Sequence, residues 1–147
     1  MIRTEGTEKL LMFHLLEVHK VIHNKSNKIF CKDGFGLQVE QIPVLMIPYY
    51  VGILSQQEIA DKISRDKSSV LRTVVSLTHA GLLVVAADPF DKRRKLVQLT
   101  AEGRKVASKI AEALSKVNDQ LFASFSEEEK EIFRALLIKL EQTVIAV

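Results

Sequence analysis

The spacing of apolar residues along the chain predicts a first helix over residues 7–28. Apolar side chains recur there every three or four residues, which places them in one stripe made of Leu11, Leu15, Val18 and Ile22. Two glycines in "CKDGFG" then interrupt the pattern. A second helix is predicted over residues 39–50, and Pro48 should end or kink it because proline lacks the amide hydrogen that a helix interior needs.

Two short helices are predicted in the middle of the chain. The stretch "SQQE" is a capping box, in which Ser55 and Glu58 bond each other's backbone amides, and it opens a helix that ends near residue 63 or 64. Asp66 is a suitable N-cap for a helix over residues 67–80. Gly81 follows at a position where helices commonly end in the left-handed conformation.

A β-hairpin and two further helices complete the pattern. The runs "LLVVAA" (residues 82–87) and "KLVQL" (residues 95–99) are rich in strand formers and flank the turn "DPFDKRRK". Thr100 then caps a long helix over residues 100–124, and a second capping box at Ser126 opens the last helix. A helix-turn-helix followed by a hairpin predicts a mainly α protein with a β-hairpin wing, that is, a winged helix-turn-helix.

Composition narrows the class of protein only moderately. The 147 residues fit one domain with an ordinary globular composition, and the net charge of +3 permits a polyanionic partner without demanding one. One cysteine, Cys31, excludes an intrachain disulfide and a multi-cysteine zinc site. The longest uncharged apolar stretch is too short to cross a bilayer, so we expect a cytoplasmic protein without a membrane partner.

Neither catalysis nor metal binding is indicated. No nucleophile has a base at a useful spacing and no glycine-rich phosphate loop is present, so we expect a protein that is not an enzyme and has no cofactor. His14 and Glu17 could share a helix face, but His23 would lie about 13 Å from His14 along the helix axis. One metal ion could not bind both histidines of one chain, and we predict no metal site.

Candidate chemistry gathers in the helix-turn-helix and the hairpin. The outer face of the helix over residues 67–80 is hydroxylated and carries one arginine, which suits contacts with phosphates and base edges; it comprises Ser68, Ser69, Arg72, Thr73 and Ser76. Lys92, Arg93, Arg94 and Lys95 are adjacent at the hairpin turn. Residues 65–95 contain seven cationic and three anionic side chains, which is a net charge of +4.

This charge distribution favours double-stranded DNA as the partner. Adjacent cations in water repel one another by roughly 1 kcal/mol per close pair. A phosphate backbone relieves that repulsion and releases counterions, and a narrow minor groove attracts arginine. Asp91 lies two residues before Arg93, so we expect an Asp91–Arg93 ion pair that orients the guanidinium.

The stretch from Leu54 to Gly103 resembles the DNA-binding core of the MarR family of bacterial regulators. The resemblance rests on the helix-turn-helix, the "HAGLL" exit, Asp91 and Arg93 of the wing, and the "LTAEG" that follows the wing. It implies that the helix over residues 67–80, with Lys67 at its start, enters the major groove. It also implies that the wing arginine Arg93, and with it Arg94, enters the minor groove. Lys92 is a further residue of the wing that we expect to contact DNA. Pro43 and Pro48 depart from the family's pattern, in the helix that commonly borders its ligand cavity.

The resemblance also implies a homodimer. Residues 1–147 would form one MarR-like domain, with a DNA-binding lobe over about residues 38–100 and dimerisation helices over about residues 7–30 and 101–147. The expected dimerisation residues are Leu11, Leu15, Val18, Leu114, Val117, Leu121, Phe133 and Leu137. The expected function is a transcriptional repressor that binds an inverted-repeat operator and is released by a small-molecule effector or an oxidant. The alternative is a protein-interaction module whose basic wing binds an acidic partner.

Overall fold

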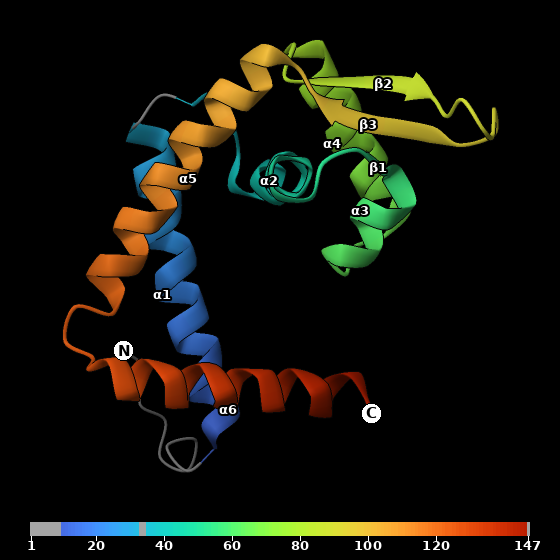
Figure 1. Ribbon diagram of the computed structural model, residues 1–147. Coiled ribbons are helices and arrows are strands. Elements are labelled where there is room, and N and C mark those ends of the chain that lie inside the picture. Colours follow the sequence, from blue (N-terminus) through green and yellow to red (C-terminus); the bar gives the residue numbers. More distant parts are fainter. Residues whose placement is uncertain (1–9, 33–34, 147) are drawn as a thin grey trace. The chain divides into compact units, whose positions relative to one another are not determined.

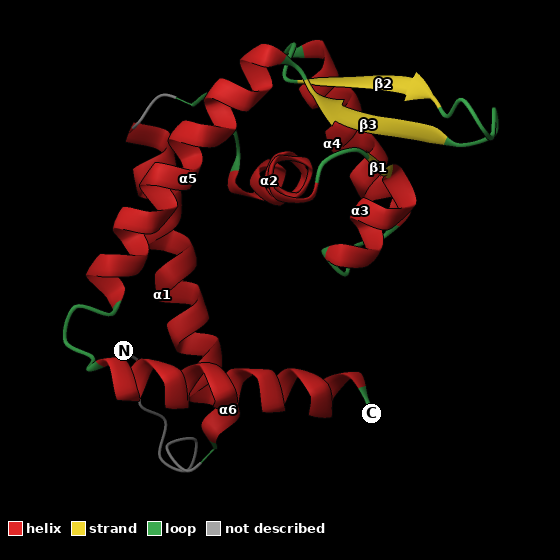
Figure 2. Ribbon diagram, in the orientation of Figure 1, coloured by secondary structure: helices red, strands yellow, loops and turns green. Residues whose placement is uncertain are grey.

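A computed structural model describes residues 10–32 and 35–146, and this part of the chain is mainly helical with a small sheet (Figures 1 and 2). The predicted fold class is confirmed. In chain order the elements are α1 (Leu11–Lys32), the 3₁₀ helix η2 (Val39–Gln41), α2 (Ile42–Val51), β1 (Leu54–Ser55), α3 (Gln56–Lys62), α4 (Lys67–His79), β2 (Leu83–Ala87), β3 (Lys95–Leu99), α5 (Ala101–Leu121) and α6 (Glu127–Ile145). The chain divides into two compact units, Met1–Ile110 and Ala111–Val147.

The sheet of the first unit has three antiparallel strands in the order β1-β3-β2. β2 and β3 form the predicted hairpin, with Leu83 opposite Leu99 at its base and Ala87 opposite Lys95 near its turn. The sequence did not reveal β1, in which Leu54 pairs with Val97 and Ser55 pairs with Leu96. A strand of two residues is too short to show alternation, and Ser55 had already been assigned as a helix cap. The extra strand attaches the hairpin to the start of α3.

In the first unit, side chains from α2, α3, α4 and the sheet form the core of a helix-turn-helix lobe. The largest side chains that are fully buried there are Val44, Leu45, Ile59, Val70, Val74, Leu77, Leu83 and Val97. Three of them recur on one face of α4, as the helical period predicts. Leu71, which is also apolar, does not share this face and is 44% exposed. Its position, one residue after Val70, rotates it by about 100° out of the buried face.

The helix predicted over residues 39–50 is found as η2 followed by α2, and Pro48 does not end it. The helix continues through Pro48 to Val51, and Gly52, with a φ of 98°, follows. Pro43 occupies the first turn, where its missing amide hydrogen costs nothing. Half of the residues of α2 are buried, including Pro48 itself. We attribute the survival of the helix to this packing, because buried apolar surface offsets the loss of one backbone hydrogen bond.

The predicted caps are confirmed, whereas several helix ends differ. Ser55 accepts a hydrogen bond from the Glu58 amide at 3.2 Å and Asp66 accepts one from the Ser69 amide at 2.8 Å. Gly81 adopts a φ of 73° at the end of α4. α1 continues to Lys32, beyond the predicted residue 28, and its predicted start at residue 7 lies outside the described residues. α5 ends at Leu121, three residues earlier than predicted.

The second unit contains the end of α5 and all of α6. A capping box opens α6, where the amides of Ser126 and Glu129 donate to each other's side chains at 2.8 and 3.1 Å. Phe122, Phe125 and Phe133 form a cluster with ring centroids 5.4 to 6.3 Å apart. No described residue of α6 is buried, although its sequence is rich in leucine and isoleucine. This unit therefore presents a large apolar surface.

Candidate nucleic-acid interface

The exposed face of α4 carries the predicted hydroxyl groups and Arg72. The side chains of Lys67, Ser68, Arg72 and Ser76 are exposed, and Ser69 and Thr73 are half-buried. Not all six are equally free to meet a partner, because the Thr73 hydroxyl donates to the Ser69 carbonyl at 3.1 Å. Ser76 accepts from the Gln41 side chain at 3.1 Å. Among the described residues, Lys67 and Arg72 have no ion-pair partner.

Backbone hydrogen bonds shape the wing turn, which comprises residues 88–94. The Asp88 amide donates to the Arg94 carbonyl at 2.9 Å, and the Arg94 amide donates to the Asp91 carbonyl at 2.9 Å. The side chain of Asp88 accepts from the Phe90 amide at 2.9 Å. A flexible turn would lose conformational entropy when its cations bind a partner. The hydrogen bonds of this turn restrict its backbone before binding, so the further loss of conformational entropy on binding is smaller.

Asp91 organises the turn through the backbone rather than through an ion pair. Its carboxylate accepts from the backbone amide of Arg93 at 3.0 Å. The expected contact of Asp91 with the Arg93 guanidinium is not found among the described residues. The two-residue separation explains the difference, because aspartate readily bonds the amide two residues ahead in a turn. The Arg93 side chain is consequently left exposed, without an ion-pair partner in the described part of the chain.

Arg94 forms ion pairs within the protein, unlike its neighbour in the sequence. Its guanidinium lies 2.6 Å from a carboxylate oxygen of Glu58 and 3.8 Å from one of Asp88. The Ser55 amide, the Arg94 guanidinium and the Ser55 hydroxyl together lower the pKa of Glu58 from 4.5 to about 2. The Glu58–Arg94 pair could not be predicted from the sequence, since 36 residues separate its members and Glu58 was already assigned as a capping residue.

The root of the wing is closed by the "LTAEG" segment. The Thr100 hydroxyl donates to the Gly81 carbonyl at 2.6 Å, and the Thr100 amide donates to the Leu82 carbonyl at 3.1 Å. The amide of Gly103 in turn donates to the Thr100 hydroxyl oxygen at 2.9 Å. A Cβ atom at Gly103 would lie only 1.9 Å from the Leu82 carbonyl oxygen. A glycine is therefore required where α5 passes the start of the hairpin.

Comparison with known proteins places this lobe in a recognised class. The family model of a winged helix DNA-binding domain matches residues 52–103. The chain is 32% identical to the HTH-type transcriptional regulator YwoH of Bacillus subtilis (strain 168) over 126 residues, covering 86% of this chain and 90% of that one.

Two solved structures have similar folds. One is a MarR family transcriptional regulator from Rhodococcus sp. RHA1, with a TM-score of 0.81, 22% identity and coverage of 93% of this chain and 96% of that one. The other is the S. aureus MepR–DNA complex, with a TM-score of 0.81, 24% identity and coverage of 90% of this chain and 96% of that one. The chain belongs to the MarR family of winged helix-turn-helix transcriptional regulators.

Within this MarR-family chain, the residues predicted to form a dimer differ in exposure. Leu11, Leu15, Val18, Phe133 and Leu137 are exposed on the single chain. Leu114 and Leu121 are half-buried, and Val117 is buried. Most of the predicted interface residues therefore remain available to a partner, whereas Val117 already has its contacts within one chain.

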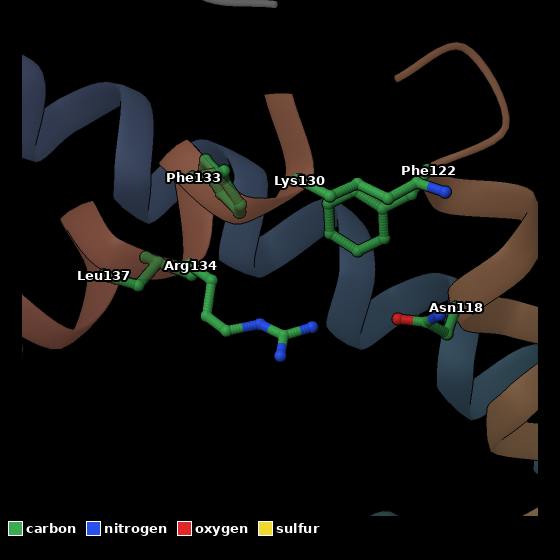
Figure 3. A pocket seen from close by; sticks show the side chains of 6 residues that line it. All are labelled: Asn118, Phe122, Lys130, Phe133, Arg134 and Leu137. Carbon is green, nitrogen blue, oxygen red and sulfur yellow. The ribbon is translucent and has the colours of Figure 1, made fainter. Parts of the chain in front are cut away.

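A pocket in the second unit adds to this apolar surface. It has a volume of about 220 Å³ and is lined by Asn118, Phe122, Lys130, Phe133, Arg134 and Leu137 (Figure 3). Two of its cations are engaged along α6, with Lys130 lying 2.7 Å from Glu127 and Arg134 lying 3.8 Å from Glu131. Phe133 and Leu137 belong to the predicted dimer interface, so the pocket lies in the surface expected to be covered by a second copy.

Sequence reasoning missed Phe90, whose side chain is 97% exposed in the wing turn of this MarR-family lobe. The position of Phe90 within "DPFDKRR" could have indicated its exposure, because side chains in a polar turn between two aspartates commonly lie in solvent. The described residues contain no group of three or more potential metal ligands. Among the same residues, no helix combines the length and the apolar character needed to span a lipid bilayer.

Proposed function

We propose that this MarR-family regulator represses transcription by binding an inverted-repeat operator as a homodimer. The observation that carries the proposal is the exposure of two cationic groups on one lobe, Arg72 on α4 and Arg93 in the wing turn, neither of which is neutralised by a described residue. Unpaired arginines at two rigid sites suit a ligand that presents negative charge at two places, as the two grooves of DNA do.

In this proposal α4 enters the major groove. Arg72 would form a bidentate contact with a guanine, while Ser68, Ser69, Thr73 and Ser76 allow the helix backbone to approach the bases closely. Lys67, in the first turn of α4, would contact phosphate. Lys92 and Arg93 of the wing would lie along the minor groove, with Asp91 holding the backbone of Arg93 in place.

The proposed homodimer would use the exposed apolar side chains of α1 and α6. Such surface is unfavourable in water at roughly 25 cal/mol per Å² of apolar area, and a second copy would remove it. Residues 38–100 would form the DNA-binding lobe, and the helices of residues 7–30 and 101–147 would form the dimer. The two α4 helices would then reach successive major grooves about one helical turn apart, which predicts an operator of roughly 15–20 base pairs.

Release of the DNA by a small-molecule effector or an oxidant is part of the proposal. An effector acts only if it binds the two states of the protein with different affinities. A change in the separation of the two lobes of the dimer would provide such a difference, because the half-site spacing is fixed by the operator.

The test is selection of bound duplexes from a random DNA pool by the purified chain, repeated at two salt concentrations. We expect an inverted repeat and an affinity that falls steeply as salt rises. Arg93→Ala should weaken binding to the selected operator by about 1–3 kcal/mol without unfolding the protein. Recovery of no motif, together with binding that is insensitive to salt, would favour the alternative of a module that binds an acidic protein.

A further inference from the structure

We infer that Arg94 and Glu58 form a latch that positions the wing against the helix-turn-helix, and that Arg94 does not read DNA. The inference rests on the proposed function and deepens it. It assigns different roles to the two adjacent arginines of the wing: Arg93 contacts DNA, and Arg94 orients Arg93.

The contacts of Arg94 reach both parts of the lobe. One nitrogen of its guanidinium lies 2.6 Å from Glu58 Oε2, at the start of α3, and another lies 3.8 Å from Asp88 Oδ2, at the end of β2. Asp88 is buried, with 8% of its surface exposed, and its other oxygen accepts from the amide of Phe90. A single side chain therefore joins the base of the wing turn to the helix-turn-helix.

Glu58 is a fixed anchor for this latch. The same oxygen, Oε2, accepts the Ser55 amide at 2.8 Å and the Arg94 guanidinium. Ser55 is paired with Leu96 of β3 and also caps α3, so the carboxylate is held by the backbone of the strand next to the wing. One guanidinium nitrogen of Arg94 is hydrogen-bonded to Glu58, and a second lies within ion-pair distance of Asp88, so the two carboxylates together restrict the orientation of the side chain.

The latch would act on the adjacent residue, Arg93. The Arg94 amide donates to the Asp91 carbonyl, and the Asp91 carboxylate accepts the Arg93 amide, so the backbone of both arginines belongs to one hydrogen-bonded turn. Fixing the Arg94 side chain therefore fixes the direction in which Arg93 leaves the turn. Orientation before binding reduces the conformational entropy lost on association with DNA.

Glu58→Gln tests the latch, because glutamine preserves a capping box and removes the negative charge that holds Arg94. The chain also offers a matched control. Glu129 of α6 occupies a second capping box with almost the same hydrogen-bond lengths, and the described residues give it no arginine partner. Glu129→Gln therefore measures the effect of the same substitution in a capping box without a latch.

The first measurement needs no DNA. Amide hydrogen exchange of the free, full-length protein is followed by NMR at Asp88 and Arg94, whose amides close the turn. Exchange at both amides should become about two- to fivefold faster in Glu58→Gln and Arg94→Ala, the range set by the coupling of an exposed ion pair. Glu129→Gln should leave it unchanged. Unchanged exchange in both latch variants would overturn the inference, whether or not the protein binds DNA.

The second measurement uses the operator selected from the random pool. Loss of the latch should weaken operator binding about two- to fivefold in Glu58→Gln, with the salt dependence unchanged, even though the substitution removes a negative charge. Arg93→Ala should also cost less in an Arg94→Ala background than alone, because an unlatched Arg93 is already poorly placed.

Two results would contradict the latch. Tighter binding by Glu58→Gln would show that its charge merely repels DNA, and a salt slope reduced by about one in Arg94→Ala would show that Arg94 contacts phosphate directly. Absence of any DNA binding by the wild-type chain would instead refute the proposed function, and the exchange measurement would still decide the latch.

Discussion

The close approach of Gly103 to Leu82 predicts that Gly103→Ala destabilises the protein, whereas helix propensity alone would predict that it stabilises the protein. Gly103 lies in the first turn of α5, where alanine would ordinarily stabilise the helix by about 1 kcal/mol relative to glycine. The added Cβ atom, however, would lie 1.9 Å from the Leu82 carbonyl oxygen and 2.8 Å from its carbonyl carbon. Both of these atoms belong to the backbone, so no side-chain rotation can relieve the contact.

The size of the effect follows from the distances. Ordinary contact begins near 3.4 Å, so the start of α5 would have to move by about 1.5 Å. Overpacking of this kind costs about 1–3 kcal/mol. The movement would also weaken the two hydrogen bonds from Thr100 to Gly81 and Leu82, at about 0.5–1.5 kcal/mol each. After subtraction of the propensity gain of about 1 kcal/mol, Gly103→Ala should lower the free energy of unfolding by about 1–5 kcal/mol.

Urea denaturation followed by circular dichroism measures this change. The protomer concentration must be the same for each variant, because the proposed dimerisation would contribute to apparent stability. With a slope of about 1–3 kcal/mol per molar urea, the midpoint should fall by about 1–2 M. Glu102→Ala, an exposed change in the same helical turn, is the control and should stay within about 0.5 kcal/mol of the wild type. A Gly103→Ala variant more stable than the wild type would refute the reasoning.

Three further predictions concern other parts of the chain. Arg72→Ala should cost about 1–3 kcal/mol of discrimination at one base pair in repeated operator selection, and an unchanged base preference would exclude a base contact. Leu137→Asp should weaken the dimer by about 2 kcal/mol or more in sedimentation, since burial of an unpaired carboxylate is unfavourable; an unaffected dimer would place the interface elsewhere. The pKa of Glu58 is lower in the folded protein, so its contribution to stability is present above pH 4.5 and is lost as the pH falls toward 2. Thermal unfolding over that range should therefore show a larger loss in the wild type than in Glu58→Gln.

Features that depend on neighbouring residues in the sequence could be predicted well. The caps at Ser55, Asp66 and Ser126 each require a polar side chain within three residues of the amide that it accepts, and all three are found. The buried face of α4 follows from a period of 3.6 residues. The resemblance to the MarR family added the placement of the wing, because the "LTAEG" segment marks where the hairpin ends.

Features that depend on distant residues could not be predicted. β1 exists because Leu54 and Ser55 pair with Val97 and Leu96, more than forty residues later. The continuation of α2 through Pro48 depends on its burial, which no local signal reports. At the site, the sequence showed a block of four cations but not that Arg94 is bound by Glu58. A run of like charges in a sequence therefore does not reveal which of its members face the partner.

Ser55 has a consequence for how a signal could reach the DNA-binding surface. This residue ends β1 and caps α3, so the hairpin and the helix-turn-helix meet at one residue. Bending the wing away from α3 would break the ladder between β1 and β3 and the helix cap together. The least costly motion is therefore a displacement of the whole lobe. In the proposed homodimer, an effector would therefore change the distance between two DNA-binding lobes whose internal structure stays intact. Mutations that make the regulator insensitive to the effector should then fall in the helices outside the lobe.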